Sequence, residues 1–283
     1  MDVRLISHVN GDGDLLEAWF KYYCRLRISS FHLIVHGPAE ENTRLYALKD
    51  SYPIVFEDTY EGPFDSREKK RRVDSLLARM RGQWILFVDS DEFVEFPYRT
   101  IGMTIRMLRL AGKNALFAHM LQHLSLQGSL DTPAVIDDPF RTQPLCSLDL
   151  YKQMGVEASI FKYPLFYCTD VTALFDGGNH ICPIGNTYSS LQAVTHHFKF
   201  RRPVSHKLSA RIQSSHPWRH ESVGFQQYLE AHGNRLPTDG SFFYSRDELF
   251  RRGLLRKFTF ATGLRYIRRL ARRIRIGENV SGS

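Results

Sequence analysis

The chain has 283 residues, of which 43% are hydrophobic and 24% charged, as expected for a soluble globular protein with one large domain or two small ones. It has no apolar run near the ~18 residues that a membrane span requires, and its first residues lack the pattern of a signal peptide. No Cys-x-x-Cys pair occurs, which argues against a zinc ribbon or a redox motif. We expect a cytoplasmic protein with reduced cysteines: Cys24, Cys146, Cys168 and Cys182.

The net charge of +8 is distributed unevenly. Residues 246–276 contain eleven Lys or Arg and two acids, so the rest of the chain is close to neutral. A nucleic-acid-binding body needs a basic face of its own, so we expect no nucleic-acid partner.

The first hundred residues alternate between short apolar runs and amphipathic segments. Leu15, Leu16, Trp19, Tyr23 and Leu26 recur at a helical period. The pattern predicts strands at 3–9, 31–37, 53–58 and 84–89, with helices at 14–26, 38–50 and 66–82, the last capped by Ser66 and followed by Gly82.

Strands that alternate with helices in this way predict a parallel, doubly wound α/β sheet, which binds ligands beyond the carboxyl ends of its strands. After Pro97 the pattern predicts a helix at 100–112, strands at 114–124, 158–168, 171–178 and 193–201, and a long polar loop at 125–146. We interpret residues 1–245 as one domain with halves 1–97 and 98–245, followed by a basic helical extension at 246–283.

The segment "WILFVDSDEFVEF" places three carboxylates directly after the fourth predicted strand. Asp89, Asp91 and Glu92 repel one another unless a cation is present. A divalent cation, Mg²⁺ or Mn²⁺, held by carboxylates and substrate phosphates would explain them. The alternatives are a solvated loop or a phosphatase with an aspartate nucleophile, but the phosphatase motif usually ends the first strand. There is no Walker sequence, and "NGDGD" lacks the third glycine of a dinucleotide fingerprint.

Three segments resemble the family 2-like group of GT-A-fold glycosyltransferases: "LLEAWFKYYCRLRISSFHLIVHG", "QWILFVDSDEF" and "VTHHFKFRRPVSHK". The resemblance spans roughly Val3 to Lys207. It implies a GT-A type, Rossmann-like, mostly parallel sheet flanked by helices, and sugar transfer from a UDP, GDP or dTDP type nucleotide-sugar. The chain lacks the Lys-Asn-Glu tripeptide frequent after the first strand, and it has His36-Gly37 where the group often has Asp or Asn. The expected donor-binding residues are Ser7, His8, Asn10, His36, Lys70, Asp89, Ser90 and Asp91.

Members of this group often complete the metal shell with a late histidine. His180 follows two glycines, and His196 and His197 are adjacent on a predicted strand, so only one of that pair can face the site. The expected metal ligands are Asp89, Asp91, His180 and His197. His119 and His123 are read as strand residues near the acceptor cleft.

An inverting transferase needs a carboxylate that takes the proton of the acceptor hydroxyl. Asp176 is the first candidate, with Asp131 and Asp149 as further ones, although Asp176 also suits a turn. The alternative to an enzyme is a non-catalytic nucleotide- or carbohydrate-binding relative. The intact acidic cluster favours the enzyme, because a relative without activity has no need of mutually repelling charges.

The basic C-terminal segment opens with Ser245-x-x-Glu248, a capping box, and continues with apolar residues at helical spacing. We expect its first part to pack on the domain. The arginine-rich stretch from Arg265 to Ile276 suits an anionic membrane surface. The sequence therefore predicts a peripheral enzyme at the cytoplasmic face of the inner membrane, acting on a glycan or lipid-linked glycan acceptor.

Overall fold

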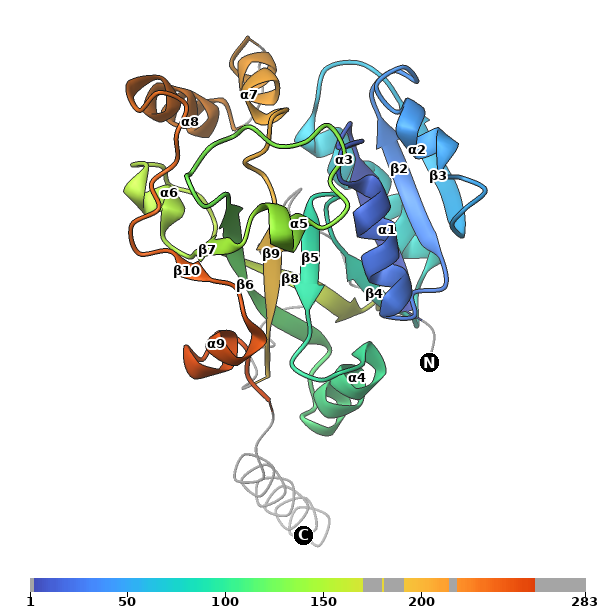
Figure 1. The fold of residues 1–283 in the computed structure, drawn as a ribbon. Coiled ribbons are helices and arrows are strands. Elements are labelled where there is room, and N and C mark those ends of the chain that lie inside the picture. The colour runs from blue at the N-terminus through green and yellow to red at the C-terminus, as the bar shows by residue number, and fades with distance from the viewer. Residues whose placement is uncertain (1–2, 170–179, 181–190, 214–217, 258–283) are drawn as a thin grey trace, which may run out of the picture.

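The computed structural model describes residues 3–169, 180, 191–213 and 218–257 (Figure 1). Its first half contains the predicted alternation of strands and helices. Strands β3, β2, β1 and β4 lie side by side in that order, and all three pairings are parallel. The elements are β1 (Val3–Val9), α1 (Leu16–Arg25), β2 (Phe31–His36), α2 (Thr43–Ala47), β3 (Ile54–Tyr60), α3 (Ser66–Arg79) and β4 (Trp84–Phe87).

Helices α1 and α3 cover opposite faces of this parallel half (Figure 1). Successive side chains of a strand point to opposite faces, so Leu5 of β1 packs with α1 whereas Ile6 packs with α3. Strands buried on both faces are rich in apolar residues, and β4 is apolar throughout, whereas β1 and β2 are buried but also carry polar residues such as Ser7 and His32. The predicted α/β class with helices flanking the sheet is confirmed.

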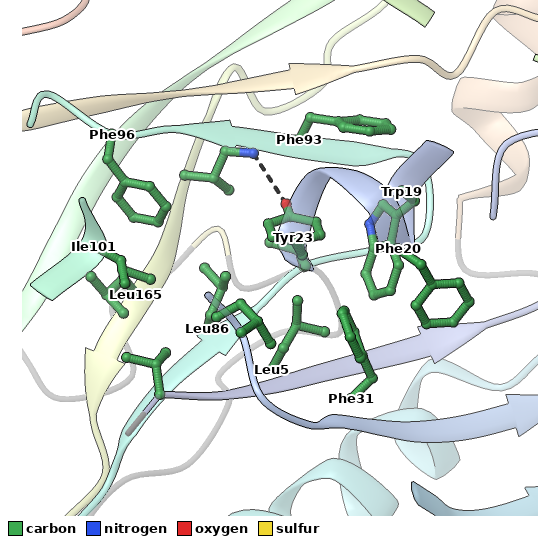
Figure 2. Close-up of a cluster of buried hydrophobic side chains, with 14 of the residues drawn as sticks. Leu5, Trp19, Phe20, Tyr23, Phe31, Leu86, Phe93, Phe96, Ile101 and Leu165 are labelled. Carbon is green, nitrogen blue, oxygen red and sulfur yellow. Dashed lines mark hydrogen bonds between the residues drawn. The ribbon is translucent and has the colours of Figure 1, made fainter. Parts of the chain in front are cut away.

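The core on the α1 face is aromatic. Figure 2 shows Trp19, Phe20 and Tyr23 of α1 packed near Leu5 and Phe31. Two of these aromatic side chains, Trp19 and Tyr23, also carry a polar group. The indole N–H of Trp19 donates to the carbonyls of Asp89 and Glu92, at 3.2 and 3.1 Å. The hydroxyl of Tyr23 donates to Glu92 at 2.9 Å and accepts from the N–H of Val94 at 3.1 Å. The first helix therefore fixes the backbone of the acidic loop.

The second half extends the sheet with mixed pairing. Strand β8 lies antiparallel between β4 and β6, and β9 lies parallel to β6 and antiparallel to β5. Strand β5 begins at Glu92, directly after the acidic residues, where no strand was predicted. The elements are β5 (Glu92–Glu95), α4 (Ile101–Leu110), β6 (Ala115–Leu124), α5 (Pro139–Thr142), β7 (Leu145–Ser147), α6 (Leu150–Gln153), β8 (Phe161–Tyr167), β9 (Gln192–His197), α7 (Val204–Gln213), α8 (Arg219–Ala231), β10 (Phe242–Phe243) and α9 (Arg246–Arg251).

The cap of α3 and the loop at 125–146 differ in detail from the predictions. The cap of α3 is Asp65, whose carboxylate accepts from the N–H of Arg67 at 2.8 Å; the prediction of Ser66 was wrong by one position. The polar loop 125–146 contains the short helix α5. The strand predicted at 171–178 lies outside the described residues.

The start of the basic extension packs on the body of the protein. The hydroxyl of Ser245 accepts from the N–H of Glu248 at 3.2 Å, as the capping pattern predicted. Leu249, Leu254 and Leu255 are buried against β6, β7 and β9. Residues 258–283, which include the predicted amphipathic stretch, lie outside the described part of the chain. Among the described residues, no helix has the length and apolar character to cross a membrane.

Candidate active site

The acidic loop connects β4 to β5 at the edge of the sheet where the parallel strands end. The N–H of Val88 donates to the carbonyl of Ile6, so the loop leaves β4 directly beside the end of β1. Strand β5 then turns to pair with β9. Asp89, Ser90 and Asp91 therefore occupy the place where doubly wound sheets bind their ligands.

Two lysines neutralise the first part of the acidic cluster. Asp89 accepts from Lys69 at 3.0 Å and from Lys162 at 2.9 Å, through different carboxylate oxygens. Lys162 also contacts both oxygens of Glu92, at 2.5 and 2.6 Å. Burial alone would raise the pKa of Asp89, but the two ammonium groups outweigh burial and hold that pKa below its usual range. The repulsion between Asp89 and Glu92 is thus relieved by the protein itself.

Asp91 faces a different partner. Its Oδ2 lies 3.4 Å from Nε2 of His197, and its backbone carbonyl accepts from the N–H of Phe198 at 2.9 Å. Burial would raise the pKa of Asp91, yet the attraction of His197, and then of Arg201 and Lys207, lowers it well below its usual range. The side chains of Asp91 and His197 remain 18% and 14% exposed, so a ligand can reach them.

A second acidic group lies behind the loop and was not predicted. Oγ of Ser90 donates to Asp12 at 2.8 Å. The other oxygen of Asp12 accepts from Arg201 and from Lys207, both at 2.6 Å, and Arg201 also pairs with Asp14. The two halves of the chain are therefore joined by buried ion pairs at the site. In the sequence, these residues are visible as the "NGDGD" run and as the basic residues that follow β9. Only the fold shows that the two segments pair with each other.

Aromatic rings and histidines surround the ends of β1, β2 and β3. Nε2 of His36 donates to the carbonyl of Gly62 at 2.9 Å, so its Nδ1 accepts from the amide of Asn10 at 2.9 Å. The rings of His36 and Tyr60 are stacked, with centroids 4.6 Å apart. His8 lies 2.8 Å from the hydroxyl of Tyr60, and burial lowers the pKa of His8 well below its usual value. An aromatic surface of this kind, in which His8 and His36 are themselves mostly buried, can hold a planar base.

Phe64 extends this aromatic surface. Its ring lies 6.1 Å from that of His8, 5.9 Å from that of His36 and 5.7 Å from that of Trp218. Phe64 is half-buried, so part of its ring is accessible. The sequence predicted His8, Asn10 and His36 here, but not Tyr60 at the end of β3, Phe64 after it or Trp218 just before α8.

Several predicted site residues have other surroundings. Ser7 is fully buried, and its hydroxyl has no hydrogen-bond partner within the described chain. Lys70 pairs with Asp74 of its own helix, and the neighbouring Lys69 is the one that contacts Asp89. His180 donates from Nδ1 to the carbonyl of Phe161 at 2.7 Å, one residue before Lys162.

The candidates for the catalytic base differ in their exposure and in their hydrogen-bond partners. Asp131 is 74% exposed and pairs with the exposed Arg202 at 2.8 Å. Asp149 accepts from the hydroxyl of Ser147 at 3.1 Å, just before α6. Asp176 lies outside the described residues.

The side chains around Asp91 suit a divalent metal. One carboxylate and one imidazole face each other, and Nδ1 of His197 is buried without a hydrogen-bond partner in the described residues. These are oxygen and nitrogen donors that Mn²⁺ accepts, and Mg²⁺ accepts the carboxylate. Asp89 differs, because both of its oxygens already accept from lysines. Of these three predicted ligands, Asp91 and His197 are the two whose ligand atoms do not accept from a lysine of the described chain.

No protein-family model and no curated protein matches this chain. Among solved structures, residues 1–349 of S. aureus TarS in complex with UDP-GlcNAc match with 10% identity and a TM-score of 0.37, over 85% of this chain and 75% of that one. A 4-diphosphocytidyl-2C-methyl-D-erythritol synthase from Anaerococcus prevotii matches with 13% identity and a TM-score of 0.27, over 48% of this chain and 61% of that one. At such scores these likenesses assign no residue a role, and the site is defined by this chain's own side chains.

Proposed function

We propose that the protein is a metal-dependent glycosyltransferase that moves a sugar from a nucleotide-sugar donor to a glycan or lipid-linked glycan. The observation that carries the proposal is the pairing of Asp91 with His197 at the carboxyl edge of the parallel strands. This pair lies at the edge where sheets of this type bind nucleotides, and the aromatic surface of His36 and Phe64 lies at the ends of the same strands.

Each group has a part in donor binding. His8, His36 and Phe64 hold the nucleotide base, and Asp91 with His197 binds Mn²⁺ or Mg²⁺. The ion supplies Lewis-acid stabilisation of the diphosphate that leaves. Lys69 and Lys162 keep Asp89 ionised and fixed, so that the loop holds Asp91 in one orientation.

The acceptor hydroxyl needs a base if the reaction inverts the sugar. Asp176 remains the first proposed base, with Asp149 and Asp131 as further candidates. The large exposure of Asp131 and its pairing with Arg202 make it the weakest of the three.

The decisive experiment measures hydrolysis and transfer with a panel of UDP-, GDP- and dTDP-sugars, with Mn²⁺ or Mg²⁺ and with EDTA. We expect one nucleotide class to be turned over, only with the metal, and to be lost in Asp91→Asn. Asp50→Asn, an exposed aspartate away from the site, is the matched control and should keep full activity.

Full turnover in EDTA would contradict the metal role. Nucleotide binding without any turnover would instead favour the second class of protein, a non-catalytic nucleotide- or carbohydrate-binding relative. The repulsion between the carboxylates is a weaker argument against such a relative than the sequence suggested. The buried Lys162 stabilises Asp89 and Glu92 even without a substrate.

We also propose that residues 265–276 bind an anionic membrane surface, which would place the enzyme at the cytoplasmic face of the inner membrane. The support is the arginine-rich sequence of this stretch. The test is sedimentation with anionic and neutral liposomes, comparing the whole chain with one that ends at Gly263. Equal binding by the two forms would rule out this role.

A further inference from the structure

Behind β5, on the side away from Asp91, three buried side chains from three strands meet. They are His123 of β6, Cys146 of β7 and His196 of β9, all fully buried. Nε2 of His123 lies 2.8 Å from Nδ1 of His196 and 3.4 Å from Sγ of Cys146. One ligand atom from each residue lies within 4.8 Å of the other two.

Both imidazoles are held from outside by oxygen atoms. Nδ1 of His123 donates to the carbonyl of Gln143 at 2.7 Å, and Nε2 of His196 donates to the carboxylate of Glu95 at 3.2 Å. A carbonyl and an ionised carboxylate only accept, so each ring carries its proton on the outer nitrogen. Histidines that ligate metals are oriented in this way, with the outer N–H on a carbonyl or carboxylate.

The inner nitrogens are consequently directed toward each other. With the outer positions protonated, neutral rings present two lone pairs 2.8 Å apart, which repel. An extra proton between the rings would relieve this repulsion, and so would a metal ion bound by both nitrogens and by the thiolate. The two explanations make different predictions about metal content.

We propose that His123, Cys146 and His196 bind a zinc ion. Zn–N bonds of ~2.0–2.1 Å and Zn–S bonds of ~2.3 Å give tetrahedral edges of about 3.4 Å between nitrogens and about 3.6 Å between nitrogen and sulfur. Nε2 of His123 is closer than this to both partners, by about 0.6 Å to His196 and by about 0.2 Å to Cys146, so the two rings need to move apart by about 0.6 Å to admit the ion. One thiolate and two imidazoles suit zinc, whereas magnesium prefers oxygen ligands.

Nearby anionic groups would lower the charge of the bound ion. Zinc binding displaces the thiol proton of Cys146 to solvent, and the thiolate cancels one of the two positive charges. The carboxylate of Glu95 lies against His196 and offsets part of the other, because Glu95 also pairs with Arg246. Glu95 is itself held by the hydroxyl of Tyr244 at 2.5 Å and by Arg246. The ion would therefore tie β6, β7 and β9 to β5 and to the start of the C-terminal segment.

The proposed zinc site is separate from the donor site. His196 and His197 are neighbours on β9, and their contacts lie on opposite sides of the strand: Glu95 and His123 for the first, Asp91 for the second. A zinc ion here would fix the strand that presents His197, without contacting the donor. The proposal does not depend on the proposed function.

The test is the metal content of the full-length chain, purified from zinc-supplemented medium and measured by mass spectrometry. We expect one zinc per chain in the wild type, and none in Cys146→Ser. Cys168→Ser is the matched control, because Cys168 is also a buried thiol but donates to the carbonyl of Leu77. It should keep the zinc. In Asp91→Asn the zinc should also remain, even if all transferase activity is lost.

Spectroscopy and stability give independent readings. Cobalt substitution should produce a sulfur-to-cobalt charge-transfer band in the wild type and in Cys168→Ser. Removing zinc with phenanthroline should lower Tm, and adding zinc back should restore it. If Cys146→Ser fails to fold, these measurements on the wild type still show whether the chain binds zinc. A folded wild-type chain that holds no zinc and takes up none on titration would show that the cluster is only a hydrogen-bonded core.

Discussion

The ammonium of Lys162 lies 2.5 and 2.6 Å from the two carboxylate oxygens of Glu92, and each side chain is only 1% exposed. Burial disfavours the charge on Lys162, but Asp89 and Glu92 outweigh burial and raise its pKa. The run of carboxylates after β4 is therefore stabilised first by the protein's own cations. Asp91, the third carboxylate, is the one directed at a histidine.

Lys162→Met is expected to destabilise the protein by about 3–5 kcal/mol, because it leaves buried carboxylates without their partner. Urea unfolding measures the change. Adding Glu92→Gln to Lys162→Met should recover part of the loss, since it removes one uncompensated charge. Lys70→Met, at an exposed helix position, should change the free energy of unfolding by less than about 0.5 kcal/mol. A small effect of Lys162→Met would mean that Glu92 is protonated in the folded state.

Asp91→Asn and His197→Ala are each expected to weaken Mn²⁺ binding by at least about tenfold, because each removes one of two protein ligands. Electron paramagnetic resonance of free Mn²⁺ reports the binding directly, without turnover. Asp50→Asn is the control and should bind Mn²⁺ as the wild type does. If His197→Ala binds Mn²⁺ normally while Asp91→Asn does not, the histidine is a partner of Asp91 and not a ligand.

Phe64→Ala is expected to lower nucleotide affinity about tenfold, because stacking on an aromatic ring contributes about 1–3 kcal/mol per base. Isothermal titration calorimetry with UDP, GDP and dTDP measures the effect. Tyr46→Ala, which removes an exposed ring on α2, should leave the affinity unchanged. Unchanged binding in Phe64→Ala would place the base elsewhere.

Asp12 should make the folded protein sensitive to acid. Burial would raise its pKa, but Lys207 and Arg201 lower it below the usual 3.8. The stability that these ion pairs provide is therefore fully present above pH 3.8 and is lost as the pH falls through the lowered pKa. Asp12→Asn should cost about 3–5 kcal/mol at neutral pH and should make stability fall less steeply below pH ~3.8. Urea midpoints over a pH series test both effects, and an unchanged acid slope would contradict this role for Asp12.

Asp65→Ala should destabilise the protein by about 1 kcal/mol, because it removes the side chain that caps α3. Ser66→Ala should have almost no effect, since Asp65 and not Ser66 accepts the N–H bond that caps the helix. Thermal unfolding of the two variants distinguishes them. A larger loss of stability in Ser66→Ala than in Asp65→Ala would identify Ser66 as the cap, as the sequence predicted.

The sequence by itself determined the elements whose side-chain period is long and regular. The strands at Val3–Val9 and Phe31–His36 and the helix from Leu16 to Arg25 were predicted closely, because burial on fixed faces imposes a period that the residues display. Strand β5 was missed, because it is only four residues long and its sequence, Glu-Phe-Val-Glu, has no alternation of polar and apolar residues. The acidic residues in it are buried only because Lys162 and His196 supply partners from distant strands.

The same distinction applies to the site. Local sequence was enough to single out Asp89 and Asp91 and to predict that only one of His196 and His197 faces them. His197 was the one predicted, and it is the one that contacts Asp91. The sequence did not predict that Lys69 rather than Lys70 contacts Asp89, because neighbouring helix residues differ in direction by about 100° and only the packing of the helix decides which of them faces the site. The pairing of Asp12 with Arg201 joins residues 189 positions apart. Charges attract at any separation along the chain, so the tertiary fold alone decided which of them meet.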